Sequence, residues 1–406
     1  MSFGSLMSFG SLGVSYMTTK SKLPLRLLRN EPLTADTSLL TFALPLGLAL
    51  GCRPGQFFNL RPLDSTAPLL RRPISICDVR PKESEVDFLI QVIGDGTRLL
   101  CETRPGAEVD AVGPLGTSFQ ADPARPALMV AGGVGVAPLY FLARQMRREA
   151  AARNMAGRAE QGLAGEAARN VAGRAEQGLA GSCEGAGGGA GSVPVRARPC
   201  PAGSDARGGS GAAGGASRAE AGTQDSASRA EAGGEASALI TFCYGARSAS
   251  HLVLLDRIER EVSRLVLTTE DGSRGAKGLV TEAAREFLKP GPRTQPGART
   301  HSGARTHSGE GTQPTDLVQP ADLVQPTDLV QPAEQIFVCG PPAMMQAVLV
   351  MMRERGLEGQ FSLENQMGCG LGACMGCVVP SRGGFLRVCC DGPVVRSEQL
   401  DFVFHS

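Results

Sequence analysis

The hydrophobic positions follow two different patterns along the chain. Between residues 20 and 122, short apolar runs such as TSLLTFALP, GQFFNLRP and VDFLIQVIG are separated by Gly and Pro. Short runs of this kind, divided by turn residues, are typical of an antiparallel barrel or sandwich. From residue 126 onward, apolar strands such as PALMVAGG and ALITFCYGAR alternate with segments of helical periodicity such as VAPLYFLARQMRREA. That alternation predicts a parallel sheet with helices on both faces.

Two long segments and the N-terminus lack a hydrophobic pattern. Residues 151–237 are rich in Gly, Ala, Arg, Glu and Ser, and ARNMAGRAEQGLAGE recurs there as ARNVAGRAEQGLAGS. Residues 291–334 repeat GARTHS and QPTDLV, and residues 1–19 repeat MSFGSL. Such sequences bury too little apolar surface to offset the entropy of ordering them. We expect mostly disordered insertions, with short helices in the alanine-rich parts and no metal role for His301 or His307.

Composition narrows the function classes. A length of 406 residues is compatible with two or three domains, and the net charge of +1 gives no basic surface for nucleic acid. No apolar run reaches the roughly 18 residues of a membrane helix. The 12 cysteines are widely spread and no signal-peptide pattern is recognised. We therefore expect a cytoplasmic protein with one metal site.

The C-terminal cysteines carry the most specific chemistry. Cys369, Cys374 and Cys377 form C-x4-C-x2-C, and Cys389 follows at a distance. This is the spacing of a plant-type 2Fe-2S ferredoxin site, in which four thiolates hold two irons. Cys390 is adjacent to Cys389, and on an extended strand only one of two neighbours can face the cluster. Spacing alone leaves that choice open.

Other interpretations of the cysteines are weaker. A structural zinc site usually combines two C-x2-C pairs, and only Cys374 and Cys377 have that spacing. Disulfides suit secreted chains, which this sequence does not resemble.

Two motifs in the first region suit an anionic cofactor. The guanidinium of Arg72, close to the hydroxyl of Ser75, can hold a phosphate with a fork of donors, although an Arg-Pro pair is also common at a strand edge. The segment from Gly94 to Thr97 combines small residues with a hydroxyl before an apolar helix. It suits an anion site, or an ordinary turn.

A glycine loop in the second region suits a dinucleotide. Gly132, Gly133 and Gly135 lie between a strand and a helix, where glycines allow a diphosphate to approach the helix N-terminus. The loop is not a full G-x-G-x-x-G, because Pro138 stands where the third glycine would be. Cys339 and Gly340 end another strand, so Cys339 either contacts a nicotinamide or flavin ring or fills the core as a small apolar residue.

The order of these motifs resembles one family. RPISI, GPLG, GGVGVAPL, YGAR, CGPPAMM and SLENQMGCGLGACMGCVV followed by VCCDGP are similar to the electron-transfer subunit of class B (NAD-dependent) dihydroorotate dehydrogenase, a relative of the ferredoxin–NADP reductases. The resemblance covers the chain from about Leu23, apart from the two insertions. The family pattern Cys-x-Asp-Gly-Pro selects Cys389 over Cys390.

The resemblance implies a fold, a domain order and site residues. The expected parts are a disordered extension (1–19), an antiparallel FAD-binding β-barrel (20–122), a Rossmann-like α/β NAD-binding domain (123–358) interrupted by the insertions 151–237 and 291–334, and a small 2Fe-2S domain (359–406). The expected FAD residues are Arg72, Pro73, Ile74, Ser75, Leu89, Ile90, Gln91, Gly96 and Thr97. The expected NAD residues are Gly132, Gly133, Gly135, Cys339 and Gly340. The expected cluster ligands are Cys369, Cys374, Cys377 and Cys389.

The resemblance also implies a function. We expect an oxidoreductase subunit that passes electrons from an FMN-bearing catalytic subunit through a 2Fe-2S cluster and FAD to NAD⁺, during orotate formation in de novo pyrimidine (UMP) biosynthesis. The expected assembly is a heterotetramer of two subunits of each kind, with no nucleic acid or membrane partner. The alternative is a related FAD/2Fe-2S reductase subunit that serves a sulfide dehydrogenase, a hydrogenase or a transhydrogenase.

Overall fold

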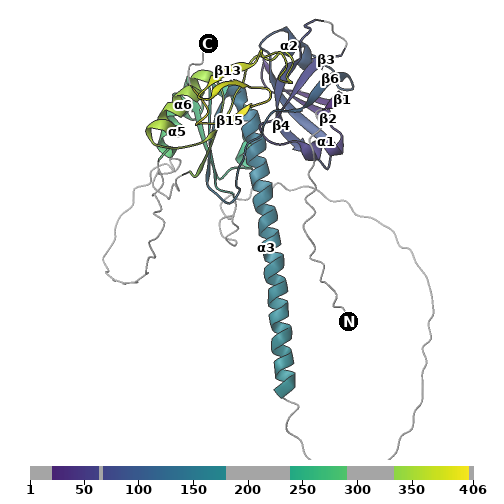
Figure 1. Ribbon diagram of the computed structural model, residues 1–406, viewed down its shortest axis with the longest axis vertical. Coiled ribbons are helices and arrows are strands. Elements are labelled where there is room, and N and C mark those ends of the chain that lie inside the picture. Colours follow the sequence, from purple (N-terminus) through teal and green to yellow (C-terminus); the bar gives the residue numbers. More distant parts are fainter. Residues whose placement is uncertain (1–20, 64–66, 180–237, 290–332, 402–406) are drawn as a thin grey trace, which may run out of the picture. The chain divides into compact units, whose positions relative to one another are not determined.

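The computed structural model describes residues 21–63, 67–179, 238–289 and 333–401 (Figure 1). The chain divides into two compact units, one formed by Met1–Arg153 with Ala236–Ser406 and the other by Asn154–Glu235. The first unit contains the barrel, the sheet and the cysteine block. Most of both predicted insertions and the N-terminal repeat lie outside the described residues.

The N-terminal part is a closed antiparallel barrel with the strand order β1-β2-β5-β4-β3-β6. Its inward side chains form one apolar cluster, in which Phe88 packs edge-to-face on Phe42 and Phe58 with ring centroids 5.8 and 5.5 Å apart. Closure leaves no free strand edge. The strands are β1 (Ser21–Pro32), β2 (Thr37–Ala43), β3 (Phe57–Pro62), β4 (Arg72–Arg80), β5 (Glu85–Gln91) and β6 (Glu108–Leu115), with the short helices α1 (Leu46–Gly51) and α2 (Asp95–Cys101).

The second part is a seven-stranded sheet with the order β10-β9-β8-β7-β11-β12-β15. All neighbouring strands in it are parallel except β12 and β15, which are antiparallel. The strands are β7 (Ala127–Gly132), β8 (Ile240–Ala246), β9 (Arg264–Thr269), β10 (Ala276–Lys277), β11 (Gln335–Cys339), β12 (Gln360–Ser362) and β15 (Val394–Arg396).

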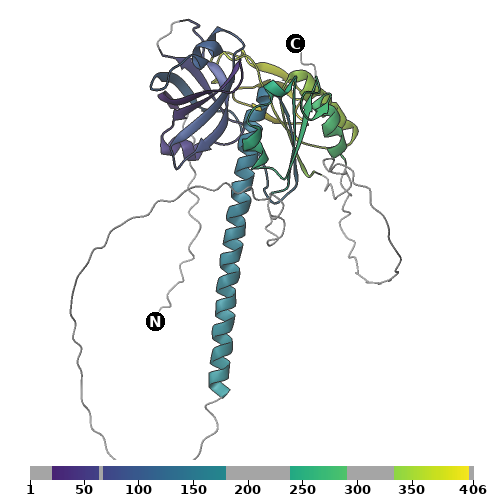
Figure 2. The same ribbon diagram turned by 180° about the vertical axis from the view of Figure 1, so that it is seen from behind.

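Helices cover both faces of this sheet (Figures 1 and 2). Along β7, Met129 and Ala131 belong to the cluster that contains α3 (Val136–Leu179) and α4 (Leu255–Glu259), whereas Leu128 and Val130 belong to the cluster that contains α5 (Val280–Phe287) and α6 (Pro342–Glu354). Alternate side chains thus enter opposite cores, as the apolar runs predicted. Two short 3₁₀ turns, η1 (Gly133–Gly135) and η2 (Ala249–His251), complete the domain. The predicted fold class is confirmed.

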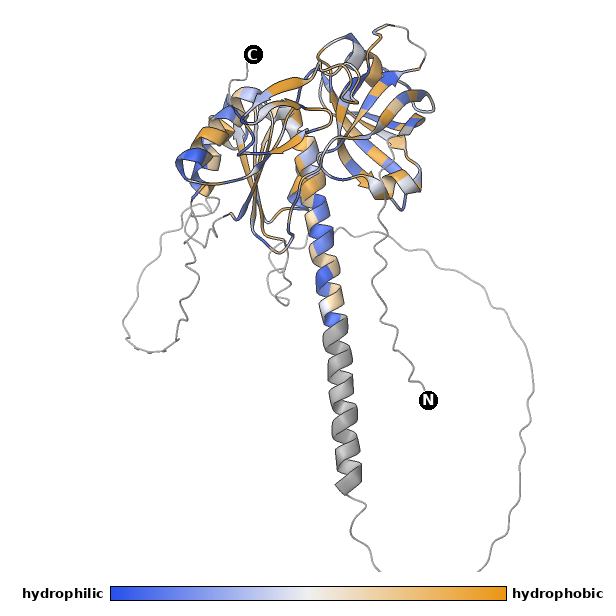
Figure 3. Ribbon diagram, viewed as in Figure 1, coloured by the Kyte–Doolittle hydropathy of each residue, from blue (hydrophilic) through white to orange (hydrophobic). Residues whose placement is uncertain are grey.

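Helix α3 is longer than the sequence analysis expected. It runs without a break past residue 150 to Leu179, whereas the repeats suggested short helices at most. Its first turns are buried through Leu139, Leu142 and Met146, and Figure 3 shows its colour changing from orange to mostly blue and pale further along. Alanine, arginine and glutamate all favour helix, so local propensity can extend a helix that packing has started. No helix in the described ranges is long and apolar enough to cross a membrane.

The cysteine block is joined to both other parts. It contains the hairpin β13 (Val378–Ser381) and β14 (Gly384–Arg387), and its flanking segments supply the last two strands of the large sheet, β12 and the edge strand β15. The sequence analysis placed residues 359–406 in a separate small domain and did not anticipate these two strands. They are only 3 residues long each, too short for a periodic pattern.

Candidate functional site

The first predicted flavin segment, residues 72–75, lies in strand β4 of the barrel. In β4, Ser75 is in register with Phe57 of β3, and Pro73 with Asn59. Ile74 points the other way and is part of the barrel core, so it can offer a ligand only its backbone. The alternation of a strand therefore divides the predicted Arg-Pro-Ile-Ser motif into outward and inward members.

Arg72 and Gly96 are brought together although they are far apart in sequence. A Cβ atom added at Gly96 would collide with the Arg72 guanidinium, so the guanidinium lies directly against the Gly96 backbone. The guanidinium also donates to the carbonyl oxygen of Leu70. A planar cation beside bare backbone suits a phosphate group, and these two residues fit the diphosphate of FAD.

Thr97 has an internal role in the structure. Its hydroxyl accepts the N–H of Ile93 at 3.0 Å and donates to the carbonyl oxygen of Gly94 at 3.0 Å. These bonds fix the turn that presents Gly96, and Thr97 is almost fully buried. Thr97 was also predicted to contact the cofactor, and in the structure its hydroxyl caps this turn.

The second flavin segment is on the neighbouring strand. Because β5 pairs with β4, its residues Leu89, Ile90 and Gln91 lie on the strand next to the first segment. Ile90 is in the barrel core and Leu89 is in the cluster that contains α3. Gln91 donates from Nε2 to Oδ2 of Asp36 at 2.8 Å. The structure thus gathers the two segments, with Gln91 already held by a carboxylate.

The predicted nucleotide residues meet at the carboxyl edge of the sheet. β7 and β11 are neighbours with Ala131 opposite Cys339. A Cβ atom at Gly135 would lie 2.5 Å from the carbonyl oxygen of Cys339, and one at Gly340 would lie 2.9 Å from the nitrogen of Gly132. These glycines allow the two strand ends to touch. This edge is where open α/β sheets bind ligands.

Gly133 and Cys339 differ in accessibility. Gly133 has φ of +53° and no atom within 4 Å of an added Cβ, so the loop is open there. Cys339 has no exposed surface, and burial raises the pKa of its thiol well above the ordinary value. Of the two interpretations of Cys339, its surroundings here match the apolar core residue.

Cys369 and Cys374 form one pair of sulfur atoms. The N–H groups of Leu371 and Cys374 donate to Sγ of Cys369 at 3.3 and 3.4 Å, and these bonds lower the pKa of Cys369 to about 6. Sγ of Cys374 accepts the N–H groups of Cys369 and Gly376 at 3.5 and 3.4 Å. The loop therefore favours the thiolate of Cys369, the form that binds iron.

Cys377 and Cys389 form a second, buried pair. The N–H of Cys389 donates to Sγ of Cys377 at 3.4 Å. The pKa of the Cys389 thiol is raised to about 12, first by burial and then by the neighbouring sulfurs of Cys377 and Cys390. Sγ of Cys390 is 3.8 Å from that of Cys389 and lies next to Gly372 of the cluster loop.

The four predicted ligands are therefore gathered as two pairs within one loop and hairpin. In the parts of the chain that the structure describes, no group of three or more His, Cys, Asp or Glu side chains is arranged to hold a metal ion. The donor set nevertheless fits an iron–sulfur cluster, because thiolates surrounded by backbone N–H groups suit soft metals and sulfide.

The cysteine block is seated on the barrel by contacts that the sequence analysis missed. Thr117 accepts the N–H of Val394 at 3.1 Å and donates to its carbonyl oxygen at 2.8 Å. The side chain of Asn59 lies against Gly370, beside Cys369. A polar residue within the apolar run FFNL was the available signal for Asn59.

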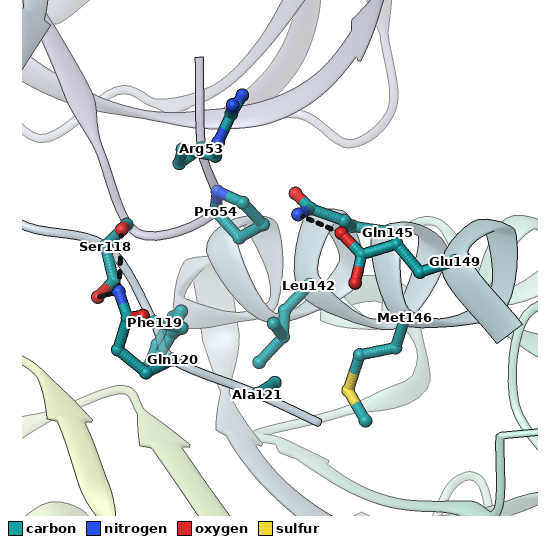
Figure 4. Close-up of a pocket in the computed structure, with 10 residues that line it drawn as sticks. All are labelled: Arg53, Pro54, Ser118, Phe119, Gln120, Ala121, Leu142, Gln145, Met146 and Glu149. Atoms are coloured by element: carbon teal, nitrogen blue, oxygen red, sulfur yellow. Dashed lines mark hydrogen bonds between the residues drawn. The ribbon is translucent and has the colours of Figure 1, made fainter. Parts of the chain in front are cut away.

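A pocket of about 250 Å³ lies elsewhere, between the barrel, the connection after β6 and helix α3 (Figure 4). Its lining includes the apolar residues Phe119, Leu142 and Met146 and the charged residues Arg53 and Glu149. None of the predicted site residues lines it, so it does not represent the proposed cofactor site.

Comparison with known proteins confirms the resemblance. Residues 364–401 match the family described as the iron–sulfur cluster binding domain of dihydroorotate dehydrogenase B, and residues 24–119 match the oxidoreductase FAD-binding domain. The chain is 26% identical over 353 residues to the dihydroorotate dehydrogenase B (NAD(+)) electron transfer subunit of a Geobacillus species, covering 86% of each protein.

A second relative, the electron transfer subunit homolog of Aquifex aeolicus, is 24% identical over 381 residues, covering 94% of this chain and 98% of that protein. Among solved structures, a chain of the NADH-dependent reduced ferredoxin-NADP oxidoreductase has the same fold, with a TM-score of 0.55 and 20% identity over 94% of this chain and 91% of that one.

Proposed function

We propose that this chain, like its Geobacillus relative, is the electron-transfer subunit of an NAD-dependent dihydroorotate dehydrogenase. In this role it accepts electrons from an FMN-bearing catalytic subunit that forms orotate, and delivers them to NAD⁺. When bound, the 2Fe-2S cluster carries single electrons, and FAD converts between single electrons and the hydride that nicotinamide accepts.

One observation carries the proposal. Asn59 of β3 is in register with Pro73 of the flavin segment on one side, and its side chain touches Gly370 of the cysteine loop. Neighbouring strands are ~4.8 Å apart. The flavin segment and the cysteine loop are thus separated by a single strand, as a chain of redox carriers requires.

Different residues would hold each of the three cofactors. Arg72 and the backbone at Gly96 would hold the FAD diphosphate. The outward surface of the flavin segments, with Ser75 and Gln91, would line the ring. The open loop at Gly133 would receive the NAD diphosphate, because free N–H groups at the start of a helix attract anions. Cys369, Cys374, Cys377 and Cys389 would ligate the cluster.

The surface around the cysteine loop suits a partner subunit. Leu371, Met375 and Phe385 are 49%, 55% and 73% exposed, and all three belong to the cysteine block. Clustered exposed apolar side chains are typical of protein interfaces. We assign this surface to the FMN-containing catalytic subunit, in a cytoplasmic heterotetramer of two subunits of each kind.

The proposal is tested on the chain purified together with its catalytic partner. We expect a flavin and 2Fe-2S absorption spectrum, equal FAD and cluster content, and reduction of NAD⁺ by dihydroorotate. A colourless protein with stoichiometric zinc, or a complex that binds FAD and iron but does not couple dihydroorotate to NAD⁺, would contradict it.

A matched pair of variants tests the fourth ligand. Cys389→Ser should abolish the cluster signal in electron paramagnetic resonance, whereas Cys390→Ser should keep it, because the thiol of Cys389 hydrogen-bonds with that of Cys377 and its backbone N–H donates to the same sulfur. The reverse result would transfer the ligand role to Cys390.

A further inference from the structure

Asn59 occupies a position where an amide side chain is unexpected. It lies in β3, between Phe58 and Leu60, which both point into the barrel core. Alternation along the strand directs Asn59 outward, yet it is only 1% exposed because the cysteine block covers it. A buried polar side chain is usually retained for a specific contact.

The oxygen of the Asn59 amide lacks a hydrogen bond in the described part of the chain. This atom, Oδ1, is buried. A buried acceptor without a partner lowers stability, so a purely structural position would favour an apolar side chain of similar shape. The amide is therefore better explained by the site that it adjoins.

The other end of the amide meets the cysteine loop. A Cβ atom added at Gly370 would collide with Nδ2 of Asn59, and Gly370 has φ of +69°. Glycine is required there both by the left-handed backbone and by the close approach of the amide. The Asn59 amide thus packs directly against the backbone of the loop.

Gly370 lies between the residue that carries one cluster sulfur and the residue whose N–H bonds to that sulfur. It follows Cys369, and it precedes Leu371, whose N–H donates to Sγ of Cys369 at 3.3 Å. Hydrogen bonds to cluster sulfurs favour the reduced, more negative state and raise the reduction potential. Any shift of Gly370 changes this bond directly.

We infer that Asn59 is a positioning residue that seats the cluster loop on the flavin-binding barrel and thereby sets the reduction potential of the cluster relative to the flavin. The inference rests on the proposed function, since it concerns the cluster of that same site. Asn59 acts through the loop backbone. Because Asn59 is in register with Pro73, it also connects the loop to the flavin segment.

The test measures the potential of the cluster in the intact complex. In a redox titration followed by electron paramagnetic resonance, Asn59→Ala should lower the midpoint so that the equilibrium between cluster and flavin changes about tenfold, which is 59 mV for one electron. FAD content should stay the same. Asn59→Asp, which keeps the shape but adds a negative charge, should lower the midpoint at least as far.

Asn30 provides the matched control. It is a partly buried asparagine in β1 whose Nδ2 donates to the carbonyl oxygens of Cys101 and Thr103 at 2.6 and 3.0 Å, and its Oδ1 also lacks a partner in the described chain. Asn30→Ala removes a comparable amide from the same barrel away from the cysteine block. It should leave the midpoint unchanged.

A rescue experiment tests the contact itself. Gly370→Ala should reduce iron and sulfide content, because the new Cβ meets the Asn59 amide. Adding Asn59→Ala should restore part of that content, because it removes the colliding atoms and leaves only the backbone strain at position 370. No rescue, together with an unchanged midpoint in Asn59→Ala, would overturn the inference.

The failure of this inference differs from failure of the proposed function. A wild-type complex without a 2Fe-2S signal would refute the proposed function before Asn59 is tested. A wild-type complex with a normal signal, and a midpoint that is the same in wild type, Asn59→Ala and Asn30→Ala, would refute the role of Asn59 alone. If Asn59→Ala and Asn30→Ala both lose the cluster, general destabilisation explains the loss and the inference is also refuted.

Discussion

The barrel meets the rest of the molecule through two surfaces of opposite chemistry. Towards the cysteine block, the contacts are uncharged and include glycines, one hydroxyl and one amide: a Cβ at Gly116 would lie 2.8 Å from the carbonyl oxygen of Gly392, Thr117 bonds to Val394, and Asn59 touches Gly370. Towards the seven-stranded sheet and its helices, the contacts include buried ion pairs. We call the first surface the cluster junction and the second the charged junction.

The carboxylates of the charged junction are almost completely removed from water. Asp78 and Asp87 are 0% and 1% exposed. Arg80 of the same barrel bonds Asp87 at 2.6 and 2.7 Å and Asp78 at 3.0 Å. The nucleotide domain supplies Arg144, which pairs with Asp78, and Arg257, which is 3.3 Å from Asp87.

The two junctions differ in what they contribute: one fixes the orientation of a domain, and the other allows a close approach. Buried ion pairs are directional, and losing one partner is costly, so the charged junction fixes the orientation of the nucleotide domain. The cluster junction relies on close backbone approach, which allows the redox carriers to come near each other. A formal charge beside a cluster would also shift its potential. Breaking each junction should therefore have different consequences.

The largest effect is expected from Arg80→Met. Asp78 and Asp87 would remain buried with fewer partners, and removing one member of a buried ion pair costs about 3–5 kcal/mol. Chemical denaturation of the complete chain should show a loss of that size. A loss below ~1 kcal/mol would mean that Arg144 and Arg257 compensate, and the charged junction would no longer differ from a surface ion pair.

The next effect is expected from Thr117→Val at the cluster junction. The backbone N–H and carbonyl of Val394 would lose their partner, and a buried group left unpaired costs about 1–3 kcal/mol. We expect faster iron loss during denaturation while FAD release is less affected. Thr103→Val, which removes one hydroxyl bond to Leu99 elsewhere on the barrel, is the control. Equal iron loss in both variants would contradict a specific role for Thr117.

The two junctions also show what the sequence could predict. Strands and helices were recognisable because apolar periodicity is a local property, and the cysteine spacing was specific because one loop supplies three of the four sulfurs. The charged junction was not recognisable, since Asp87 and Arg257 are 170 residues apart in the chain. Charged residues on strands and helices look like solvated positions until the fold brings them together.

The flavin site was predicted in part for a similar reason. Arg72 and Gly96 were identified separately, but their contact depends on the turn fixed by Thr97. Ile74 and Ile90 were counted as contacts although their side chains face the barrel core. A motif gives residue identities, whereas the strand register decides which side chains reach a ligand.

A smaller effect, confined to acid, is expected at Glu85, which lies at the edge of the charged junction. Hydrogen bonds from Arg29 and then Arg80 lower the pKa of Glu85 from 4.5 to about 2. The unfolded chain therefore binds this proton at higher pH than the folded chain, so the stabilisation is complete above about pH 4.5 and is lost as the pH falls towards 2. The difference in unfolding free energy between wild type and Glu85→Gln should shrink over that interval. A difference independent of pH would contradict the assignment.

The smallest effect is expected from Arg125→Ala. Arg125 and Glu334 form an ion pair of 2.8 Å, close to the distances around Arg80, but both side chains are 51% exposed. Water screens such a pair, and exposed pairs contribute only about 0–1 kcal/mol. Denaturation of Arg125→Ala should therefore be within ~1 kcal/mol of wild type. A loss approaching that of Arg80→Met would show that distance, rather than burial, determines the strength of these ion pairs, and would remove the physical basis of the contrast between the two junctions.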